Sequence, residues 1–194
     1  MKTIWISLKI FLFFTVVTGI IYPLLITGIS QVAFPSQANG SLLLKNNVIT
    51  GSKLIGQQFD SAKYFCSRPS AVSYNPLPSG GTNFGLTNAK LKHSVDSLRG
   101  SFIAFNLLDK NSKVPSEMVF SSASGLDPDI SVEAALLQVE RISKARHFDE
   151  NQKQEVLKLI KEQTEKPQFL LFGEERINVL LLNLALDNIN INKN

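Results

Sequence analysis

The longest apolar run of the chain covers residues 10–29 and contains no Asp, Glu, Lys or Arg. A helix rises about 1.5 Å per residue, so this run would be about 30 Å long, which matches the hydrocarbon core of a bilayer. A run that enters lipid must be helical, because its backbone polar groups find no water there. The uncharged stretch continues to Phe34, and no second run of this length follows. We therefore predict a transmembrane helix over 10–34, with its core at 10–29, and one soluble domain over 35–194.

The lysines around this run predict its orientation. Lys2 and Lys9 precede the run, and the next cations are Lys45 and Lys53. The positive-inside bias then places residues 1–9 in the cytoplasm and residues 35–194 outside. A cleaved signal peptide is the competing interpretation, but it needs a shorter apolar core and a small-x-small cleavage site. An uncleaved signal anchor fits the run better.

Three residues of the predicted anchor bear on how it packs. Thr15 and Gly19 lie one helical turn apart, and Pro23 follows one turn later. Small residues let a second membrane helix approach closely, whereas proline is expected to kink the helix. Gly and Pro are also frequent in membrane helices that have no partner. Packing against a partner helix and ordinary membrane composition therefore both remain open.

Charge and cysteine content narrow the classes of partner and site. The net charge is +4 and is spread without a long basic run, which does not indicate nucleic acid. Cys66 is the only cysteine, so no disulfide can form within the chain. Two histidines far apart give no metal-site spacing. We expect no nucleic-acid partner and no metal.

The soluble part predicts a mixed α+β fold. Residues 41–50 predict a β-hairpin, because two apolar runs flank Asn46 and Asn47, and asparagine tolerates the positive φ of tight turns. Apolar spacing and capping residues predict the remaining elements. These are a helix capped by Thr87 that reaches Phe105, a short strand at 118–120, a helix over 132–146 capped by Ser131, a helix capped by Asp149, a buried strand at 169–172, and a helix capped by Asn178 with Leu180, Leu181, Leu184 and Ala185 inward.

A long segment between the hairpin and the first of these helices, residues 51–91, is rich in Gly, Pro, Ser and Asn. Loops of this length are uncommon unless they are functional or held by their own aromatic side chains. Its motifs resemble, in order and spacing, the C subunit of the Kdp potassium-transporting P-type ATPase. The matching residues are Gly51-Ser52, Leu54-Ile55-Gly56-Gln57, Phe59, Tyr64-Phe65, Arg68-Pro69-Ser70-Ala71, Tyr74-Asn75, Ser79-Gly80-Gly81 and Asn83.

The second half of the chain resembles the same family. Residues 124–131 are similar to its SGLDP-x-IS segment, although Asp129 stands where the family has a histidine. Gln138, Arg141 and Arg146 follow its QV-x-R-x-x-x-AR pattern. Residues 176–187 are similar to its closing segment, with Leu182 in place of a glutamate. A glutamate there suggests that Leu182 lies at the surface.

The resemblance implies a non-catalytic accessory subunit of a high-affinity, ATP-driven potassium uptake complex in the bacterial plasma membrane. Its partners would be membrane lipid and the two subunits that translocate potassium and hydrolyse ATP. The family's C subunit is required for assembly and is described as a catalytic chaperone that raises ATP affinity. The nucleotide-contact candidates that this implies are Gln138, Ser79, Gly80 and Gly81. Structural or partner-contact candidates are Arg68, Pro69, Ser70, Tyr74, Asn75 and Asn83.

Two observations limit a direct role in catalysis. The sequence has no G-x-S-x-G, S-x-x-K or Walker A motif, and no Asp-Lys-Thr-Gly-Thr phosphorylation motif. ATP is cytoplasmic, whereas the lysine bias places the soluble domain outside, so an effect on ATP affinity would be indirect. An anchored extracytoplasmic enzyme or ligand-binding module that uses the 64–84 loop is the alternative hypothesis.

Overall fold

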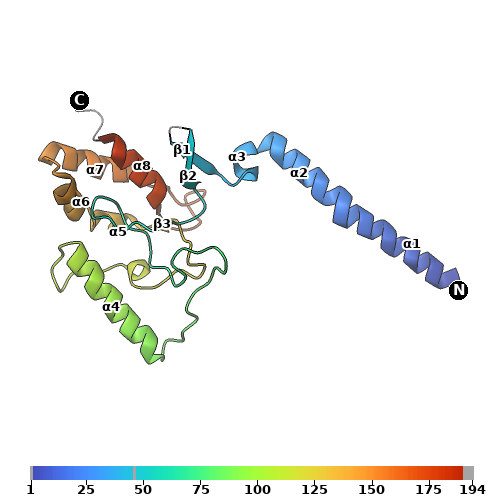
Figure 1. Cartoon of the computed structure of the whole chain (residues 1–194), viewed down its shortest axis with the longest axis horizontal. Coiled ribbons are helices and arrows are strands. Elements are labelled where there is room, and N and C mark those ends of the chain that lie inside the picture. The colour runs from blue at the N-terminus through green and yellow to red at the C-terminus, as the bar shows by residue number, and fades with distance from the viewer. Residues whose placement is uncertain (1, 46, 190–194) are drawn as a thin grey trace. The chain divides into compact units, whose positions relative to one another are not determined.

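The structure is a computed structural model that describes residues 2–45 and 47–189 (Figure 1). Contacts within the chain separate two compact units, residues 1–52 and residues 53–194. The first unit holds one long apolar helix and a hairpin, and the second mixes helices with two short strands. The predicted α+β class with a single N-terminal apolar helix is therefore confirmed.

The N-terminal helix is longer than the predicted span. It comprises α1 (Lys2–Val16), a π-helical turn η1 (Val17–Ile21) and α2 (Tyr22–Ala33). Over its 32 residues it is long and apolar enough to cross a membrane, and none of the most apolar window is buried. The π-helical turn ends two residues before Pro23, whose ring lacks an N–H and disturbs the i→i−4 ladder. The short helix α3 (Pro35–Ala38) follows.

The predicted hairpin is confirmed. Strand β1 (Leu42–Lys45) pairs antiparallel with β2 (Val48–Ser52), with a register shift between Leu43 and Leu44. Asn47 has a φ of 61°, in the left-handed region that asparagine tolerates. Asn46 lies outside the described residues.

The second unit is built from helices around one small sheet (Figure 1). Strands β3 (Asp129–Ile130) and β4 (Ile177–Asn178) pair antiparallel, and α7 packs against α5, α6 and α8. The helices are α4 (Ala89–Phe105), the 3₁₀ turn η2 (Ser116–Met118), α5 (Val132–Leu136), α6 (Val139–Arg146), α7 (Glu150–Gln163) and α8 (Val179–Ile189).

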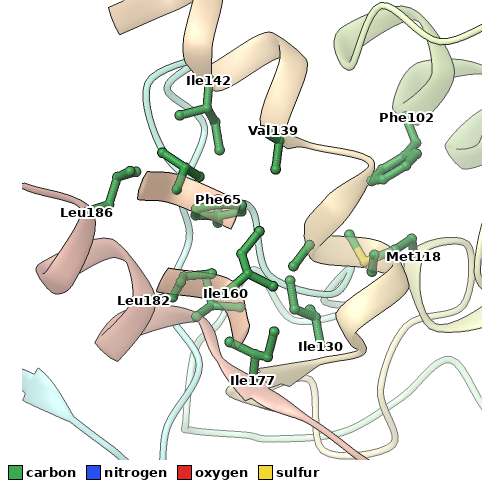
Figure 2. Close-up of a cluster of buried hydrophobic side chains, with 14 residues drawn as sticks. Phe65, Phe102, Met118, Ile130, Val139, Ile142, Ile160, Ile177, Leu182 and Leu186 are labelled. Atoms are coloured by element: carbon green, nitrogen blue, oxygen red, sulfur yellow. The ribbon is translucent and has the colours of Figure 1, made fainter. Parts of the chain in front are cut away.

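One residue of the long loop lies at the centre of the core. Phe65 is fully buried, and Figure 2 shows it among side chains from α6, α7 and α8. Burying an aromatic side chain removes a large apolar area from water, so this contact fixes the loop onto the helices. The surrounding core residues include Ile130, Val139, Ile142, Ile160, Ile177, Leu182 and Leu186.

Side chains at three helix starts behave as the sequence predicts. Ser131 Oγ accepts from the Ala134 N–H at 3.1 Å, and Asn178 Oδ1 accepts from the Leu181 N–H at 3.1 Å. Asp149 forms a full capping box with Gln152. These predictions hold because a cap depends on a few neighbouring residues.

The N-cap residue predicted for α4 is wrong by one position. Asn88, and not Thr87, accepts from the Lys90 N–H at 2.8 Å. Either side chain has an oxygen suited to the cap, so the sequence did not separate them.

The predicted helix over 132–146 is two helices. Gln138 N–H bonds to the carbonyl of Ala135 at 3.0 Å, and the Gln138 side chain donates to the carbonyl of Ala134 at 3.2 Å. These bonds replace the regular i→i−4 ladder, so the chain turns between α5 and α6 and Leu136 is exposed.

Three further predictions are wrong. Residues 118–120 form no strand, because the chain there follows the 3₁₀ turn η2. Residues 169–172 form an exposed turn and not a buried strand. Leu182 is fully buried and not at the surface, since the inward face of α8 consists of Val179, Leu180, Leu182, Asn183 and Leu186.

Candidate functional site

The central feature of the loop is residues 61–66, hereafter the clamped segment, which is neither helix nor strand. All six of its carbonyl groups accept hydrogen bonds from side chains of the second half of the chain. Buried backbone groups need such partners, and helices or sheets normally supply them. Here four side chains supply them, from Arg141, Arg146, Asn183 and Gln138.

Arg141 bonds to three of the six carbonyl groups, more than any of the other three side chains. It is 3% exposed, and its guanidinium donates to the carbonyls of Ala62 at 2.6 Å and Tyr64 at 2.9 Å. Its Nε donates to Asn106 Oδ1 at 2.9 Å, and its carbon Cζ lies 4.5 Å from the ring centroid of Phe105. None of these partners is a carboxylate, and burial lowers the pKa of Arg141. A buried cation is stabilised here by neutral acceptors and an aromatic face.

Two side-chain amides hold the end of the clamped segment. Gln138 accepts from the Cys66 N–H at 2.7 Å and donates to the Cys66 carbonyl at 3.3 Å. Asn183 accepts from the Phe65 N–H at 2.8 Å and donates to its carbonyl at 2.9 Å. Each amide thus pairs with one residue as a neighbouring β-strand would, which explains why Phe65 is buried without any strand beside it.

Arg146 completes the contacts at the other side of the segment. Its Nε donates to the Lys63 carbonyl at 2.7 Å, and its Nη2 lies 3.0 Å from Asp187 Oδ1. Its guanidinium carbon also lies 4.8 Å from the ring centroid of Tyr64. The Arg146 side chain is only 4% exposed, so this ion pair joins α6 to α8 from a buried position.

The loop residues that follow form local turns. Ser70 Oγ accepts from the N–H groups of Val72 and Tyr74, and the Tyr74 hydroxyl donates to the Arg68 carbonyl. Burial raises the pKa of Tyr74 to about 12. Asn75 Oδ1 accepts from the Leu77 N–H at 3.0 Å. These contacts show how the motif residues shape the loop.

Arg68 and Pro69 connect this loop to residues 122–127. Arg68 Nη1 lies 2.6 Å from Asp127 Oδ2, and the Pro69 carbonyl accepts from the Ser122 N–H at 3.3 Å. Gly80 N–H donates to the Ser124 carbonyl at 2.9 Å. The two segments whose motifs the sequence analysis singled out therefore lie against each other.

Glycines permit this close approach. A Cβ at Gly56 would lie 2.5 Å from the carbonyl oxygen of Asp127, and one at Gly81 would lie 3.3 Å from that of Ala123. A Cβ at Gly80 would meet nothing within 4 Å. Of these three glycines, Gly56 is the one where the backbone requires the absence of a side chain. Ser79 and Asn83 are exposed, and Asn83 has a φ of 53°.

A cleft of about 460 Å³ lies between the loop and α4. Its wall includes Arg68, Tyr74, Phe102, Phe105 and Cys66. Burial raises the pKa of the Cys66 thiol. Within the part of the chain that the structure describes, no three His, Cys, Asp or Glu side chains are grouped to hold a metal ion.

The candidate residues of the N-terminal helix are exposed. The Thr15 hydroxyl donates to the Phe11 carbonyl at 2.8 Å within the same helix, and a Cβ at Gly19 would meet nothing within 4 Å. Pro23 lies in the first turn of α2, after the π-helical turn. The described helices α1, η1 and α2 bury no residue.

Arg141, Arg146, Asn183 and Gln138, together with the segment that they hold, are hereafter called the clamp. Sequence reasoning missed Asn183, and it missed Asn106, which accepts from Arg141. Both are polar residues within apolar stretches, and both are at most 2% exposed. A polar residue that interrupts an apolar face was the available signal, because such a residue is buried only where it finds partners.

Comparison with known proteins identifies the family of the chain. Residues 4–188 match the KdpC family, described as the c chain of the K⁺-transporting ATPase. A potassium-transporting ATPase KdpC subunit of Allorhizobium ampelinum is 48% identical over 177 residues, which cover 90% of each chain. That of Dechloromonas aromatica is 44% identical over 188 residues, covering 94% of this chain and 95% of the relative. That of Caldanaerobacter subterraneus is 43% identical over 181 residues, covering 93% and 92%. The chain belongs to the KdpC family of K⁺-transporting ATPase subunits.

Proposed function

We propose that the chain is a non-catalytic accessory subunit that assembles and stabilises a potassium-transporting ATPase complex. The observation that carries this proposal is the clamp. The motif residues Gln138, Arg141 and Arg146 all bind the chain's own backbone, so their chemistry is used for folding. Residues in that role position a surface and do not activate a substrate.

The position of Gln138 favours an indirect effect on ATP affinity. Gln138 is 0% exposed, and its amide bonds to Cys66, Ala134 and Arg141. A nucleotide would have to displace these bonds to reach it, and each buried group left unpaired costs about 1–3 kcal/mol. Ser79 is exposed, but Gly80 is already bonded to Ser124. We propose that any influence on ATP affinity passes through contacts with the hydrolytic subunit.

The partners follow from the family. Its relatives are named potassium-transporting ATPase subunits, which supports a complex whose other subunits translocate potassium and hydrolyse ATP. The exposed apolar helix supports a place in the membrane, where Thr15 and Gly19 offer a narrow face to a partner helix.

Assembly and nucleotide affinity can be separated by experiment. Cells that lack this chain should yield little complex of the other subunits and little potassium-stimulated ATP hydrolysis. The variant Gln138→Leu should lower the yield of complex, while the complex that does form keeps the wild-type KM for ATP. A raised KM with unchanged yield would contradict the proposed role of Gln138. Unchanged yield and activity without the chain would contradict the accessory function.

The orientation needs a probe other than Cys66, because burial raises the pKa of that thiol and limits access. Lys158 is a better position, since its side chain is 75% exposed on α7. We propose that the second unit is outside, so a Cys66→Ala/Lys158→Cys chain should react with a membrane-impermeant maleimide in intact cells. Reaction only after lysis would place the unit in the cytoplasm. The second unit would then be on the same side of the membrane as ATP, and direct contact with the nucleotide would be physically possible.

A further inference from the structure

An apolar turn ends the hairpin-like segment 165–176. Phe169, Leu170, Leu171 and Phe172, hereafter the apolar tip, are 83%, 79%, 75% and 63% exposed. Single exposed apolar residues are common on proteins, whereas a contiguous group often marks an interaction site. Among the described residues of the second unit, no other four consecutive large apolar residues are exposed. The folded chain itself gains nothing from this exposure.

The backbone of the tip is also unfavourable for its residues. Phe169 and Leu170 have φ angles of 55° and 60°, and the Leu171 N–H donates to the Gln168 carbonyl at 3.2 Å. Tight turns with two left-handed residues favour Asn and Gly, because larger side chains are strained there. Strain that coincides with exposure indicates a role outside the folding of the isolated chain.

The base of the segment holds the tip in place. Glu165 and Arg176 exchange backbone hydrogen bonds of 2.8 and 3.2 Å, and their side chains form an ion pair at 3.0 Å. Lys53 Nζ lies 2.9 Å from Glu165 Oε1, and Arg176 Nε lies 3.1 Å from Asp129 Oδ2. The tip therefore projects from a cross-linked base, which lowers the entropy lost on binding.

The surface at the base of this segment, around Arg176, is acidic. A hollow of about 470 Å³ is lined by five carboxylates and two guanidinium groups. These are Glu117, Asp127, Asp129, Glu174 and Glu175, with Arg68 and Arg176. Glu174 and Glu175 are separated from the tip by Gly173 alone and are exposed. Such a surface repels anionic lipid headgroups and favours a basic protein surface.

We propose that the apolar tip inserts into an apolar pocket with a basic rim on another subunit of the ATPase. The inference rests on the proposed accessory function, and it names the surface that performs it. The tip supplies apolar burial, and the acidic hollow supplies charge complementarity at the edge of the contact. A lipid surface is the competing occupant.

Photocrosslinking in the intact complex identifies the occupant. A photoreactive phenylalanine analogue at Leu170 should crosslink to another subunit of the ATPase, identified by mass. The same analogue at Leu86, which is 95% exposed but isolated, is the control and should give no such product. Adducts with lipid alone, or no adduct at Leu170, would overturn the proposal.

Assembly provides an independent test. The double variant Phe169→Ser/Leu171→Ser should lower the yield of co-purified complex at least tenfold, whereas Leu86→Ser should leave it unchanged. The full-length variant should keep wild-type protease resistance, because the tip is outside the core. If the double variant assembles normally, and assembly is lost only when the whole chain is absent, the proposed role of the tip is refuted. The accessory function is then still supported. Assembly that survives without the chain would refute the accessory function itself.

Discussion

Replacing Arg141 by methionine tests whether the clamp holds the loop. The change keeps an unbranched apolar stem but removes every guanidinium donor. The Ala62 and Tyr64 carbonyls lose donors at 2.6 and 2.9 Å, and Asn106 Oδ1 loses one at 2.9 Å. The contact of the cation with the Phe105 ring is lost as well.

The expected cost follows from these acceptors. Each buried acceptor left unpaired costs about 1–3 kcal/mol. Ala62 and Tyr64 are only half-buried, so water will reach them in part, whereas Asn106 is 1% exposed. We expect a loss of about 4 kcal/mol, a large share of the roughly 5–15 kcal/mol that stabilises a typical domain.

Cys66 provides the assay, because it is the only thiol and lies at the end of the clamped segment. The full-length chain in detergent is equilibrated in urea, and a short pulse of thiol reagent then modifies the unfolded fraction. Reaction is normalised to the fully denatured chain, since Arg141 itself influences the Cys66 pKa. The midpoint of Arg141→Met should fall well below that of the wild type.

Two controls separate hydrogen bonding from charge and from position on α6. Lys144→Met removes a cation whose side chain is 62% exposed, and it should cost less than about 0.5 kcal/mol. Arg141→Lys keeps the charge but offers three donors and no planar fork, so it should not restore the wild-type midpoint. A loss below about 1 kcal/mol for Arg141→Met, or full rescue by lysine, would refute the clamp as the main support of the loop.

Three further predictions concern the packing of Gly56, the pH dependence of stability through Asp129 and the reactivity of the Cys66 thiol. Gly56→Ala should destabilise the chain by about 1–3 kcal/mol in urea unfolding, because its Cβ would lie 2.5 Å from a backbone oxygen, whereas Gly80→Ala, with open space, should stay within about 0.5 kcal/mol. Burial raises the pKa of Asp129 despite the opposing effect of Arg176, so its contribution to stability is present at low pH and is lost as pH rises through the folded pKa. The change in stability caused by Asp129→Asn should therefore be more favourable at pH 7 than at pH 4, and the reverse order would contradict this sign. Burial also raises the pKa of the Cys66 thiol, so its alkylation at pH 8 should be slower in the native chain than in urea, and equal rates would show an accessible thiol.

Local signals in the sequence predicted the elements that depend on local contacts. The apolar run predicted a single long helix, and Ser131, Asp149 and Asn178 predicted three helix starts. The apolar spacing on α7 is consistent with this, since Val156 and Ile160 are buried there and Leu157 is partly buried. Capping and helical periodicity involve residues a few positions apart, so the sequence displays them directly.

The clamp was hidden because its partners are distant in the chain. Gln138 bonds to Cys66 across 72 residues, and Asn183 bonds to Phe65 across 118. A polar residue on a helix normally predicts a solvent-exposed position, and Gln138 and Asn183 break that rule only because the loop brings backbone groups to them. Counting Asn183 as a polar, outward residue also misplaced the inward face of α8, and the family's glutamate at position 182 wrongly suggested that Leu182 is at the surface.

The predicted buried strand at 169–172 was wrong for the opposite reason. A run such as Phe169–Phe172 normally indicates burial, and in the isolated chain it is exposed. A subunit's sequence is adapted to the assembled complex, so hydrophobic pattern predicts what is buried there and not what is buried within one chain. The clamp and the tip then have complementary tasks. The polar residues of the clamp, which the sequence pattern predicts to be exposed, are buried and hold the loop. The apolar residues of the tip, which the pattern predicts to be buried, are exposed on a cross-linked base. That inversion is what we expect if the chain has the accessory function proposed above.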